Sequence, residues 1–189
     1  ENDLEKAIDG FQKYITRFPS GLHAIKANFY LAQSLIKNNQ TEAAIPNYQF
    51  VIDQNQSEFS EESLNKLAQI YLEKELWNEA TPLLERLEVE ANYPQNILFA
   101  QSNLMKSYYQ SGNLAKAVEF AKKVLNNEKL NSDLESDAKV IIARTAIQNK
   151  DFTIAKKYYE EVEKTAKGEV MAEALFYSAY FKNDAKKYK

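Results

Sequence analysis

The residue types that carry catalysis or bind metals are sparse in this chain. His23 is the one histidine, and there is no cysteine with which it could form a zinc site. Glu160, Glu161 and Glu163 form an acidic run typical of a solvated helix face, and not the carboxylate pair among apolar residues that general acid–base catalysis needs. Since the chain also has no glycine-rich phosphate loop and no nucleophile elbow, we expect no catalytic residue and no cofactor.

Three acidic residues have the spacing that begins a calcium-binding loop. Asp133, Glu135 and Asp137 mimic the first ligands of such a loop. Ala138 stands where the loop requires glycine, and Arg144 occupies the twelfth position, where a bidentate glutamate belongs. We therefore interpret these acids as residues that favour a helix N-terminus, and we predict no metal site.

The composition favours helices and excludes several classes of partner. Of the 189 residues 44% are hydrophobic and 27% charged, so the chain can bury a substantial apolar surface. With only 4 glycines and 4 prolines, helix is favoured nearly everywhere. The net charge is −3 and no block of lysines and arginines could track a phosphate backbone, so nucleic acid is not an expected partner. No apolar run of about 18 residues is present, so no membrane span is expected.

A short pattern that recurs along the chain sets its organisation. An alanine returns at nearly equal intervals of about 37 residues, at Ala7, Ala44, Ala80, Ala117 and Ala155. Four of these alanines are followed four residues later by a bulky side chain, at Phe11, Tyr48, Leu84 and Tyr159. Self-similarity at this period indicates an array of repeated units that bury their apolar faces on one another. Such arrays usually present surfaces that hold other chains rather than pockets for reactions.

A small residue recurs in the other helix of each unit. Its series runs through Ala32, Ala68, Met105, Ala143 and Ala179. A small side chain at this position lets two helices approach closely, and a bulky replacement would cost about 1–3 kcal/mol through overpacking. Large residues that precede the repeating alanines by three positions, such as Trp77, are expected to fill the space between paired helices.

Together these markers predict an all-α fold of about ten helices. The expected helices span 3–18, 22–38, 42–54, 59–74, 78–91, 95–111, 114–127, 133–149, 152–167 and 170–184. Asn39 and Gly112 are expected to adopt the left-handed conformation that ends a helix. Pro46 and Pro82 fall near the first turn of a helix, where a missing N–H is best tolerated, so we expect late or slightly distorted starts rather than broken helices.

The repeat signature matches that of a known family. In the second full unit its positions are filled by Leu64, Leu67, Ala68, Tyr71 and Ala80. This pattern resembles the tetratricopeptide repeat, and Ala7, Phe11 and Pro19 resemble the second half of that repeat. The resemblance implies a right-handed α-solenoid of stacked antiparallel helix pairs. The period here exceeds the family's usual length of about 34 residues, which implies an extra turn in some helices or loops.

The resemblance covers the chain as one array. We expect a half-unit at 1–19, full units at about 22–56, 59–92, 94–130 and 133–168, and a final first helix at 170–184. The helices at the two ends carry apolar residues without a polar capping face, at Leu4, Ala7, Phe11, Phe176, Tyr177 and Tyr180. We therefore expect either a fragment of a longer array or ends that pair with another copy.

One stretch has a narrower resemblance. Residues 11–52, with Phe18, Pro19 and Ala32, are similar to tetratricopeptide repeats of bacterial cell-envelope proteins, among them outer-membrane assembly lipoproteins. That similarity implies a periplasmic or cell-envelope location and a role in envelope assembly. A cytoplasmic location is the alternative.

The first helices of this family line a concave groove, which gives candidate binding residues. Counting from the small residue of each unit, the candidates are Lys26, Phe29, Gln33, Asn65, Gln69, Phe99, Ser102, Lys106, Tyr109, Arg144, Phe176 and Tyr180. Aromatic rings beside amides and cations suit an extended or helical peptide, because rings supply contact area and amides bind backbone groups. The alternative for Phe29, Phe99 and Tyr109 is packing against the neighbouring unit.

These observations favour a non-catalytic scaffold that binds a peptide or helical segment of a partner protein in its groove. One alternative is a structural module that associates with itself through its apolar ends. Another is a non-catalytic repeat region of a larger enzyme or regulator.

Overall fold

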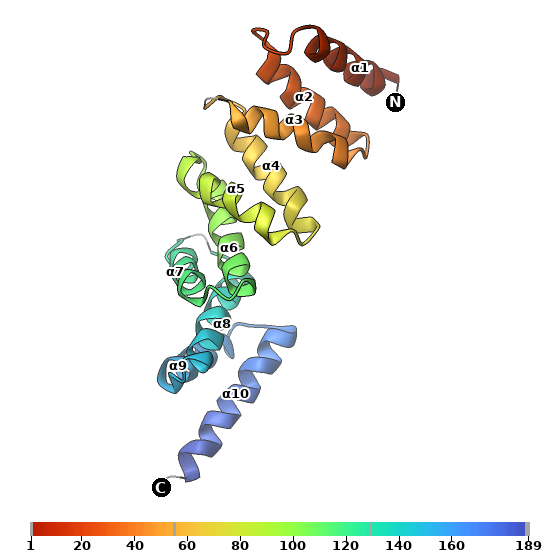
Figure 1. The fold of residues 1–189 in the computed structure, drawn as a ribbon. Coiled ribbons are helices and arrows are strands. Elements are labelled where there is room, and N and C mark those ends of the chain that lie inside the picture. Colours follow the sequence, from red (N-terminus) through yellow and green to blue (C-terminus); the bar gives the residue numbers. More distant parts are fainter. Residues whose placement is uncertain (1, 55, 129, 188–189) are drawn as a thin grey trace. The chain divides into compact units, whose positions relative to one another are not determined.

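The computed structural model describes residues 2–54, 56–128 and 130–187, and these residues form ten α-helices and no strand (Figure 1). The predicted all-α fold of ten helices is thereby confirmed. The helices are α1 (Asn2–Arg17), α2 (Ala24–Lys37), α3 (Thr41–Asp53), α4 (Ser60–Glu73), α5 (Trp77–Glu90), α6 (Pro94–Gln110), α7 (Leu114–Leu125), α8 (Ser132–Gln148), α9 (Phe152–Val162) and α10 (Gly168–Lys187).

Most predicted boundaries lie within two residues of the observed ones, and α9 is the main exception. It ends at Val162, five residues before the predicted end at 167. The next turns are closed by tighter bonds, in which the N–H of Lys164 and of Thr165 reach carbonyls three residues back. Gly168 then opens α10 with a φ of 58°, in the left-handed region that glycine tolerates best.

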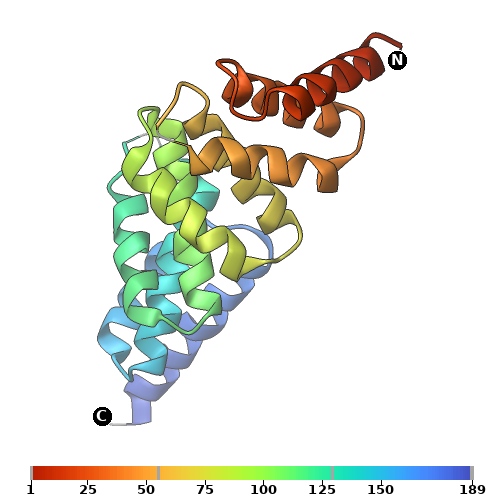
Figure 2. The ribbon, with the colours of Figure 1, turned by 45° about the horizontal axis from the view of Figure 1, so that its top comes forward.

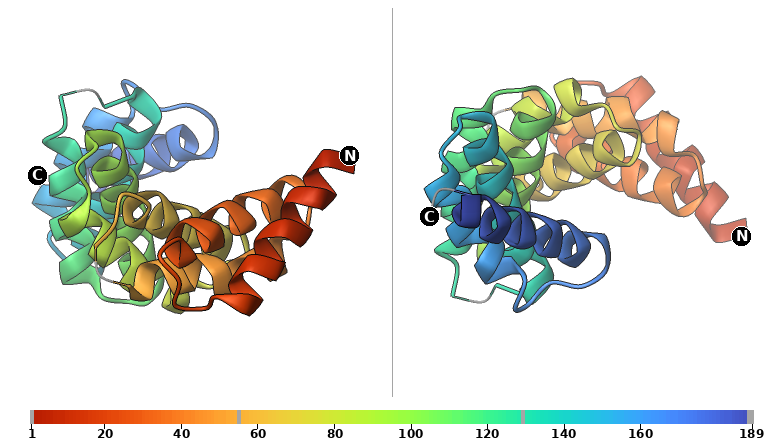
Figure 3. Two further views of the ribbon diagram at one scale, coloured as in Figure 1. Left: turned by 90° about the horizontal axis from the view of Figure 1, so that it is seen from above. Right: turned by 90° about the horizontal axis from the view of Figure 1, so that it is seen from below.

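The chain divides into two compact units, residues 1–96 and 97–189, which are described separately. In the first unit α2 packs against α1 and α3, and α4 against α3 and α5. In the second unit α8 packs against α7 and α9, and α10 packs mainly against α9. Figures 2 and 3 show these helices from other directions. We call α2, α4, α6, α8 and α10 first helices, and α1, α3, α5, α7 and α9 second helices.

The repeating small side chains lie where paired helices approach each other. In the second helices Ala44, Ala80, Ala117 and Ala155 have no solvent-exposed surface. In the first helices the same is true of Ala32, Ala68, Met105 and Ala143. Methionine can replace alanine in this series because its unbranched, flexible side chain fits an irregular gap. Trp77, expected to fill the space between helices, is half-buried.

The small-residue series was predicted one residue out of register in α10. Ala179 is exposed, and Ser178 is buried in its place. The rotation of α10 is set by its aromatic residues: Tyr177 stacks on Tyr159 at 4.6 Å between ring centroids, and Phe181 is buried. The Ser178 hydroxyl is buried without a hydrogen-bond partner among the described residues, a cost that the aromatic contacts must offset.

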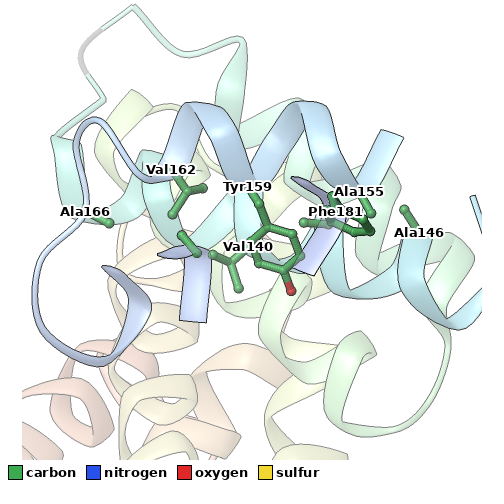
Figure 4. Close-up of a cluster of buried hydrophobic side chains, with 9 residues drawn as sticks. Val140, Ala146, Ala155, Tyr159, Val162, Ala166 and Phe181 are labelled. Atoms are coloured by element: carbon green, nitrogen blue, oxygen red, sulfur yellow. The ribbon is translucent and has the colours of Figure 1, made fainter. Parts of the chain in front are cut away.

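The core of the second unit gathers around Tyr159 (Figure 4). Its ring lies among buried side chains of α8, α9 and α10, including Val140, Ala155, Val162 and Phe181. Burying a large aromatic ring contributes more apolar area than burying the smaller aliphatic side chains of this cluster. The bulky residue that follows the repeating alanine by four positions is therefore a main packing element here.

Neither internal proline delays its helix. Pro46 and Pro82 are each the sixth residue of a helix, and α3 and α5 start at Thr41 and Trp77, so the expected late starts were wrong. The continuity has a simple reason. Each proline is exposed, so the carbonyl that loses its helical donor can bond to water.

The turn between the two helices of each pair contains one residue in the left-handed conformation. Positive φ occurs at Asn39 (59°), Glu75 (58°), Gly112 (77°) and Lys150 (59°), at the same interval as the repeating alanines. The expectation for Asn39 and Gly112 is confirmed. Glu75 and Lys150 were missed because charged side chains give no signal for this conformation. Three of the turns close with a bond from the next N–H to the carbonyl five residues earlier, at 2.8–2.9 Å.

These turns generate a stability prediction. Lys150→Gly should stabilise the protein by about 0.5–1 kcal/mol, because it removes the Cβ penalty of a left-handed residue, which exceeds the added unfolded-state entropy. Chemical denaturation followed by circular dichroism measures the change. Lys150→Ala keeps the Cβ and should give no such gain; an equal gain from alanine would contradict the explanation. Gly112→Ala should lose about 1 kcal/mol, although its Cβ would meet no atom within 4 Å.

Candidate protein-binding face

Successive first helices are joined by polar contacts that recur along the chain. In the first unit Gln33 of α2 donates to Glu62 of α4 at 2.8 Å, and Asn65 of α4 donates to Asn96 at the start of α6 at 3.0 Å. In the second unit Lys106 of α6 pairs with Asp137 of α8 at 2.8 Å, and Arg144 of α8 with Glu173 of α10. In each case the second partner lies 29 or 31 residues further along the sequence, about two helical turns short of one repeat.

This recurrence gives several candidate binding residues a structural role. Gln33, Lys106 and Arg144 each follow the small residue of their helix by one position, so their side chains extend toward the next first helix. There they meet a carboxylate. Their donors hold neighbouring repeats in register, and a partner that used the same donors would have to share or displace these bonds.

In the first unit a carboxylate of α4 caps the N-terminus of α6. Glu61 accepts hydrogen bonds from the backbone N–H of Asn92 (2.9 Å) and of Tyr93 (3.2 Å), and from the side-chain amide of Asn96 (2.7 Å). The start of a helix leaves N–H groups without partners, and Pro94 itself has none. Tyr93 precedes the helix but lacks the short oxygen-bearing side chain of a usual cap. The carboxylate from the preceding first helix instead accepts from the N–H of Tyr93, which directly precedes the helix, and from the N–H of Asn92.

The same contacts shift the acidity of Glu61. Partial burial alone would raise its pKa, but hydrogen bonds from Asn92, Asn96 and Tyr93 outweigh burial and lower the pKa below its ordinary value of 4.5. A carboxylate with a lowered folded pKa stabilises the protein above the unfolded value. That contribution is lost as the pH falls through the folded pKa.

Glu61 also fixes the orientation of a chain of amides. Because a carboxylate only accepts, Asn96 turns its amide nitrogen toward Glu61 and its oxygen toward Asn65. Asn65 in turn accepts from Gln69 at 2.5 Å. The candidate residues Asn65 and Gln69 are therefore held in a defined orientation before any partner arrives.

A cleft of about 690 Å³ lies beside this network in the first unit. Its lining comes from the loop before α4, from α4 itself and from the stretch between the end of α5 and the start of α6: Gln56, Ser57, Glu58, Ser60, Glu61, Glu62, Asn65, Lys66, Glu90, Asn92, Tyr93 and Asn96. Four carboxylates face one lysine in this set. The cleft has the polarity and negative charge to receive backbone amides and cationic side chains.

In the second unit three side chains from three helices form one cluster. The Arg144 guanidinium of α8 donates to Glu173 of α10 through two nitrogens, at 2.9 and 2.5 Å, and the buried Tyr159 hydroxyl of α9 donates to the same carboxylate at 2.7 Å. These donors lower the pKa of Glu173, and the bond to Glu173 raises the pKa of Arg144. Burial, followed by the bond to Glu173, raises the pKa of Tyr159. At neutral pH the cluster is a charged pair with a neutral phenol.

The remaining candidate residues differ in how far they reach the surface. Lys26 lies 5.9 Å from the Tyr30 ring centroid, whereas Phe29 is buried and packs on Phe59 with ring centroids 4.7 Å apart. Phe29 thus takes the packing alternative, because it closes the contact between α2 and the start of α4.

In the second unit Phe99 and Tyr109 of α6 are half-buried, and Ser102 is buried with its hydroxyl bonded to the Phe99 carbonyl at 3.0 Å. Phe176 and Tyr180 of α10 are 64% and 49% exposed. The aromatic candidates that offer most surface are therefore those of α10.

Several residues of this face were missed by the sequence reasoning. These are the acceptors Glu61, Glu62, Asn96, Asp137 and Glu173. The donors could be found by counting from the small residue of each helix, but an acceptor almost a full repeat further on is visible only once the register between first helices is known. Among the described residues no group of His, Cys, Asp or Glu could hold a metal ion, and no helix has the length and apolar character to cross a membrane.

Comparison with known proteins finds one matching family model. Residues 30–97 match the tetratricopeptide repeat. The matched segment holds α3, α4, α5 and most of α2, the part of the chain where Leu64, Leu67 and Ala68 gave the clearest signature. The match supports the tetratricopeptide repeat family, whose members generally mediate protein–protein interaction and whose fold is typically non-catalytic. No curated protein matches the chain.

Solved structures share the fold. PilF of Pseudomonas aeruginosa is 17% identical with a TM-score of 0.61, over 98% of this chain and 78% of that one. TPR-like repeats from a candidate kinesin light chain of Podospora anserina are 18% identical with a TM-score of 0.53, over 91% of this chain and 89% of that one. A variant of the same repeats gives 19% identity and a TM-score of 0.53, over 87% of both chains. At these identities the likeness shows the fold alone.

The cap of α6 by Glu61 can be tested by removing its charge. Glu61→Gln should destabilise the protein by about 1 kcal/mol at neutral pH, because one amide oxygen replaces a carboxylate that accepts three bonds. The loss should shrink as the pH falls from 4.5 through the lowered pKa of folded Glu61, because the contribution of the carboxylate is lost over that range. Urea unfolding across this pH range measures both effects. Glu58→Gln removes a charge from the same cleft without removing a cap and should change stability much less; a loss that does not depend on pH would contradict the role of the carboxylate.

The cluster of the second unit gives a matched pair of tyrosine variants. Tyr159→Phe should destabilise the protein by about 1–2 kcal/mol, because it removes a buried bond to a charged acceptor while keeping the ring. Tyr158→Phe removes the hydroxyl of the half-buried neighbour and serves as control. Thermal unfolding of both variants provides the measurement. Equal melting temperatures for the two variants would contradict a special contribution from Tyr159.

Proposed function

We propose that this chain is a non-catalytic scaffold that binds an extended peptide segment of a partner protein along its first helices. The observation that carries the proposal is the acidic cleft of the first unit, where Asn65 is oriented by a network that is anchored on Glu61 through Asn96. Amides that are already oriented lose little entropy on binding, which favours their use as partners for a peptide backbone. The general role of tetratricopeptide repeats in protein–protein interaction supports the same conclusion.

The charge of the cleft specifies the chemistry of the segment. Glu58, Glu62 and Glu90 stand around the amides, and Lys66 is the cation that lines the cleft. Glu62 is tied to Gln33 and Glu90 to Arg86, but each carboxylate keeps further lone pairs for a ligand. We therefore propose a partner segment with lysine or arginine side chains beside its bound backbone. Its association rate should fall as salt screens the field of the cleft.

The second unit offers a complementary surface on one helix. Phe99, Lys106 and Tyr109 lie on one stripe of α6 and are each partly exposed. We propose that this stripe supplies apolar contact area to a partner, with Arg144, Phe176 and Tyr180 on the later first helices. Ser102 is buried, so its contribution is to the packing of α6.

We also propose a periplasmic or cell-envelope location with a role in envelope assembly, and a cytoplasmic location is the alternative. The similarity of residues 11–52 to repeats of envelope proteins supports the first. Fractionation of the source cells with an antibody against this chain distinguishes the two.

A random peptide library displayed on phage and selected on the 189-residue chain tests the binding proposal. The selected peptides should be enriched in lysine and arginine, and the double variant Glu58→Lys/Glu62→Lys should weaken their binding about tenfold or more, because it reverses the charge of the cleft. Glu128→Lys makes the same kind of charge change outside the cleft and should leave binding nearly unchanged. Selection of acidic or uncharged peptides, or equal losses in both variants, would reject the cleft as the binding site.

A further inference from the structure

One position of the repeat changes from a large residue to a small one in α8. Three residues after the small-residue position of α2, α4, α6 and α8 the chain has Leu35, Tyr71, Tyr108 and Ala146. In α6 this tyrosine is buried, and its ring stacks on Phe120 of α7 with the centroids 5.6 Å apart. In α8 the same position holds only a methyl group, at one end of the buried cluster drawn in Figure 4.

A pocket of about 330 Å³ lies beside Ala146, between the second helices α7 and α9. Ile142 and Ala146 of α8 line this pocket and are buried, so they form its floor. Val118 of α7, with Ile154 and Tyr158 of α9, also line it and are more exposed, so they form its sides. The volume is close to the lower limit of about 300 Å³ for small-ligand pockets. The pocket therefore suits one side chain rather than a folded segment.

The packing of α6 on α7 indicates which side chain fits. Tyr158 of α9 corresponds to Phe120 of α7, because each follows the repeating alanine of its helix by three positions. The ring of Tyr108 covers Phe120, whereas Tyr158 lines the open pocket. A ring supplied from outside the chain would find an aromatic partner for stacking and an apolar floor beneath it. The internal repeat thus serves as a template for an aromatic guest.

Two lysines give the rim of the pocket a positive charge. Lys122 of α7 and Lys157 of α9 line it and are exposed, and Lys157 lies 5.5 Å from the ring centroid of Tyr158. Within the described part of the chain neither lysine has an ion pair, and the carboxylate of the lining is that of Asp151. That carboxylate caps α9 by accepting from the N–H of Ile154 at 3.1 Å. The rim therefore favours carboxylates in a guest.

We propose that this pocket binds a tyrosine or phenylalanine side chain from an acidic segment of a partner protein. The ring lies over Ala146 and stacks on Tyr158, and carboxylates beside it in the partner pair with Lys122 and Lys157. The site is separate from the proposed function, because no residue of the pocket lines the acidic cleft of the first unit or belongs to the α6 stripe. The two sites select segments of opposite charge, so one chain is able to hold two different segments.

Three synthetic pentapeptides with blocked ends separate the contributions of the ring and of the charge. The test peptide is Glu-Glu-Tyr-Glu-Glu. One control peptide has alanine in place of the tyrosine, and the other has lysines in place of the glutamates. Titration of the isotope-labelled chain, followed by NMR, measures the dissociation constant at the amides around the pocket. There the test peptide should bind about tenfold or more tightly than either control.

Two variants remove the ring site and the charge separately. Ala146→Tyr fills the pocket with the side chain that α6 carries at this position, and should weaken binding of the test peptide about tenfold or more. Lys122→Glu with Lys157→Glu changes exposed positions only, and should make the lysine peptide the tighter ligand at the pocket. Circular dichroism checks that each variant is folded.

A control variant makes the same charge change elsewhere. Lys164→Glu with Lys167→Glu alters two exposed lysines that do not line the pocket. This variant should bind the test peptide within about twofold of wild type, because the charge at the rim is unchanged.

Four results would overturn the proposal. These are no shift at the pocket with millimolar test peptide, equal binding of the tyrosine and alanine peptides, shifts confined to helices other than α7, α8 and α9, and equal losses in the two double lysine variants. None of them bears on the acidic cleft, whose own test uses basic peptides. Shifts that the lysine peptide causes in the first unit report on that cleft alone.

Discussion

The structure depends on the close approach of paired helices over buried alanines. Ala44 and Ala155 on second helices, and Ala32 and Ala143 on first helices, leave no side chain beyond a methyl group between the backbones. Dispersion contacts and apolar burial grow as the two surfaces approach, so each alanine lets the larger residues around it, such as Tyr159, interdigitate at full density. Because the same contact recurs in every helix pair, a small or flexible residue is needed at the same position of each repeat.

Apolar packing alone would leave successive first helices free to slide along one another. Polar bonds between them remove that freedom. Lys106 with Asp137, and Arg144 with Glu173, tie successive first helices at defined points. Partly exposed ion pairs contribute little to stability, but each has a narrow range of allowed geometry. Their effect is therefore on register: they select one rotation and one translation of each helix against the next.

The sequence predicted the positions of the helices better than the contacts between them. The period of the alanines located ten helices within a few residues, because helix length, turn position and packing face all follow from local spacing. In α10 the same counting chose Ala179 over Ser178, since side-chain size was the only available criterion and the stacking of Tyr177 on Tyr159 is a tertiary effect. The candidate face was predicted as aromatic rings, amides and cations, without the acceptors that bind those amides and cations. Burial of Phe29 and capping by Glu61 depend on which helices become neighbours, which no single helix encodes.

The cap that Glu61 places on α6 has a consequence for cooperativity. Helix pairs in such arrays are often treated as independent blocks joined by nearest-neighbour terms. Here the two residues just before α6 bond to Glu61 of α4, a helix that is not the hairpin partner of α6, so melting of α4 also removes the acceptor of the Asn92 and Tyr93 N–H groups. Fraying at one repeat is thereby transmitted to the next, and the coupling resides in a single ionised side chain that acid can switch off.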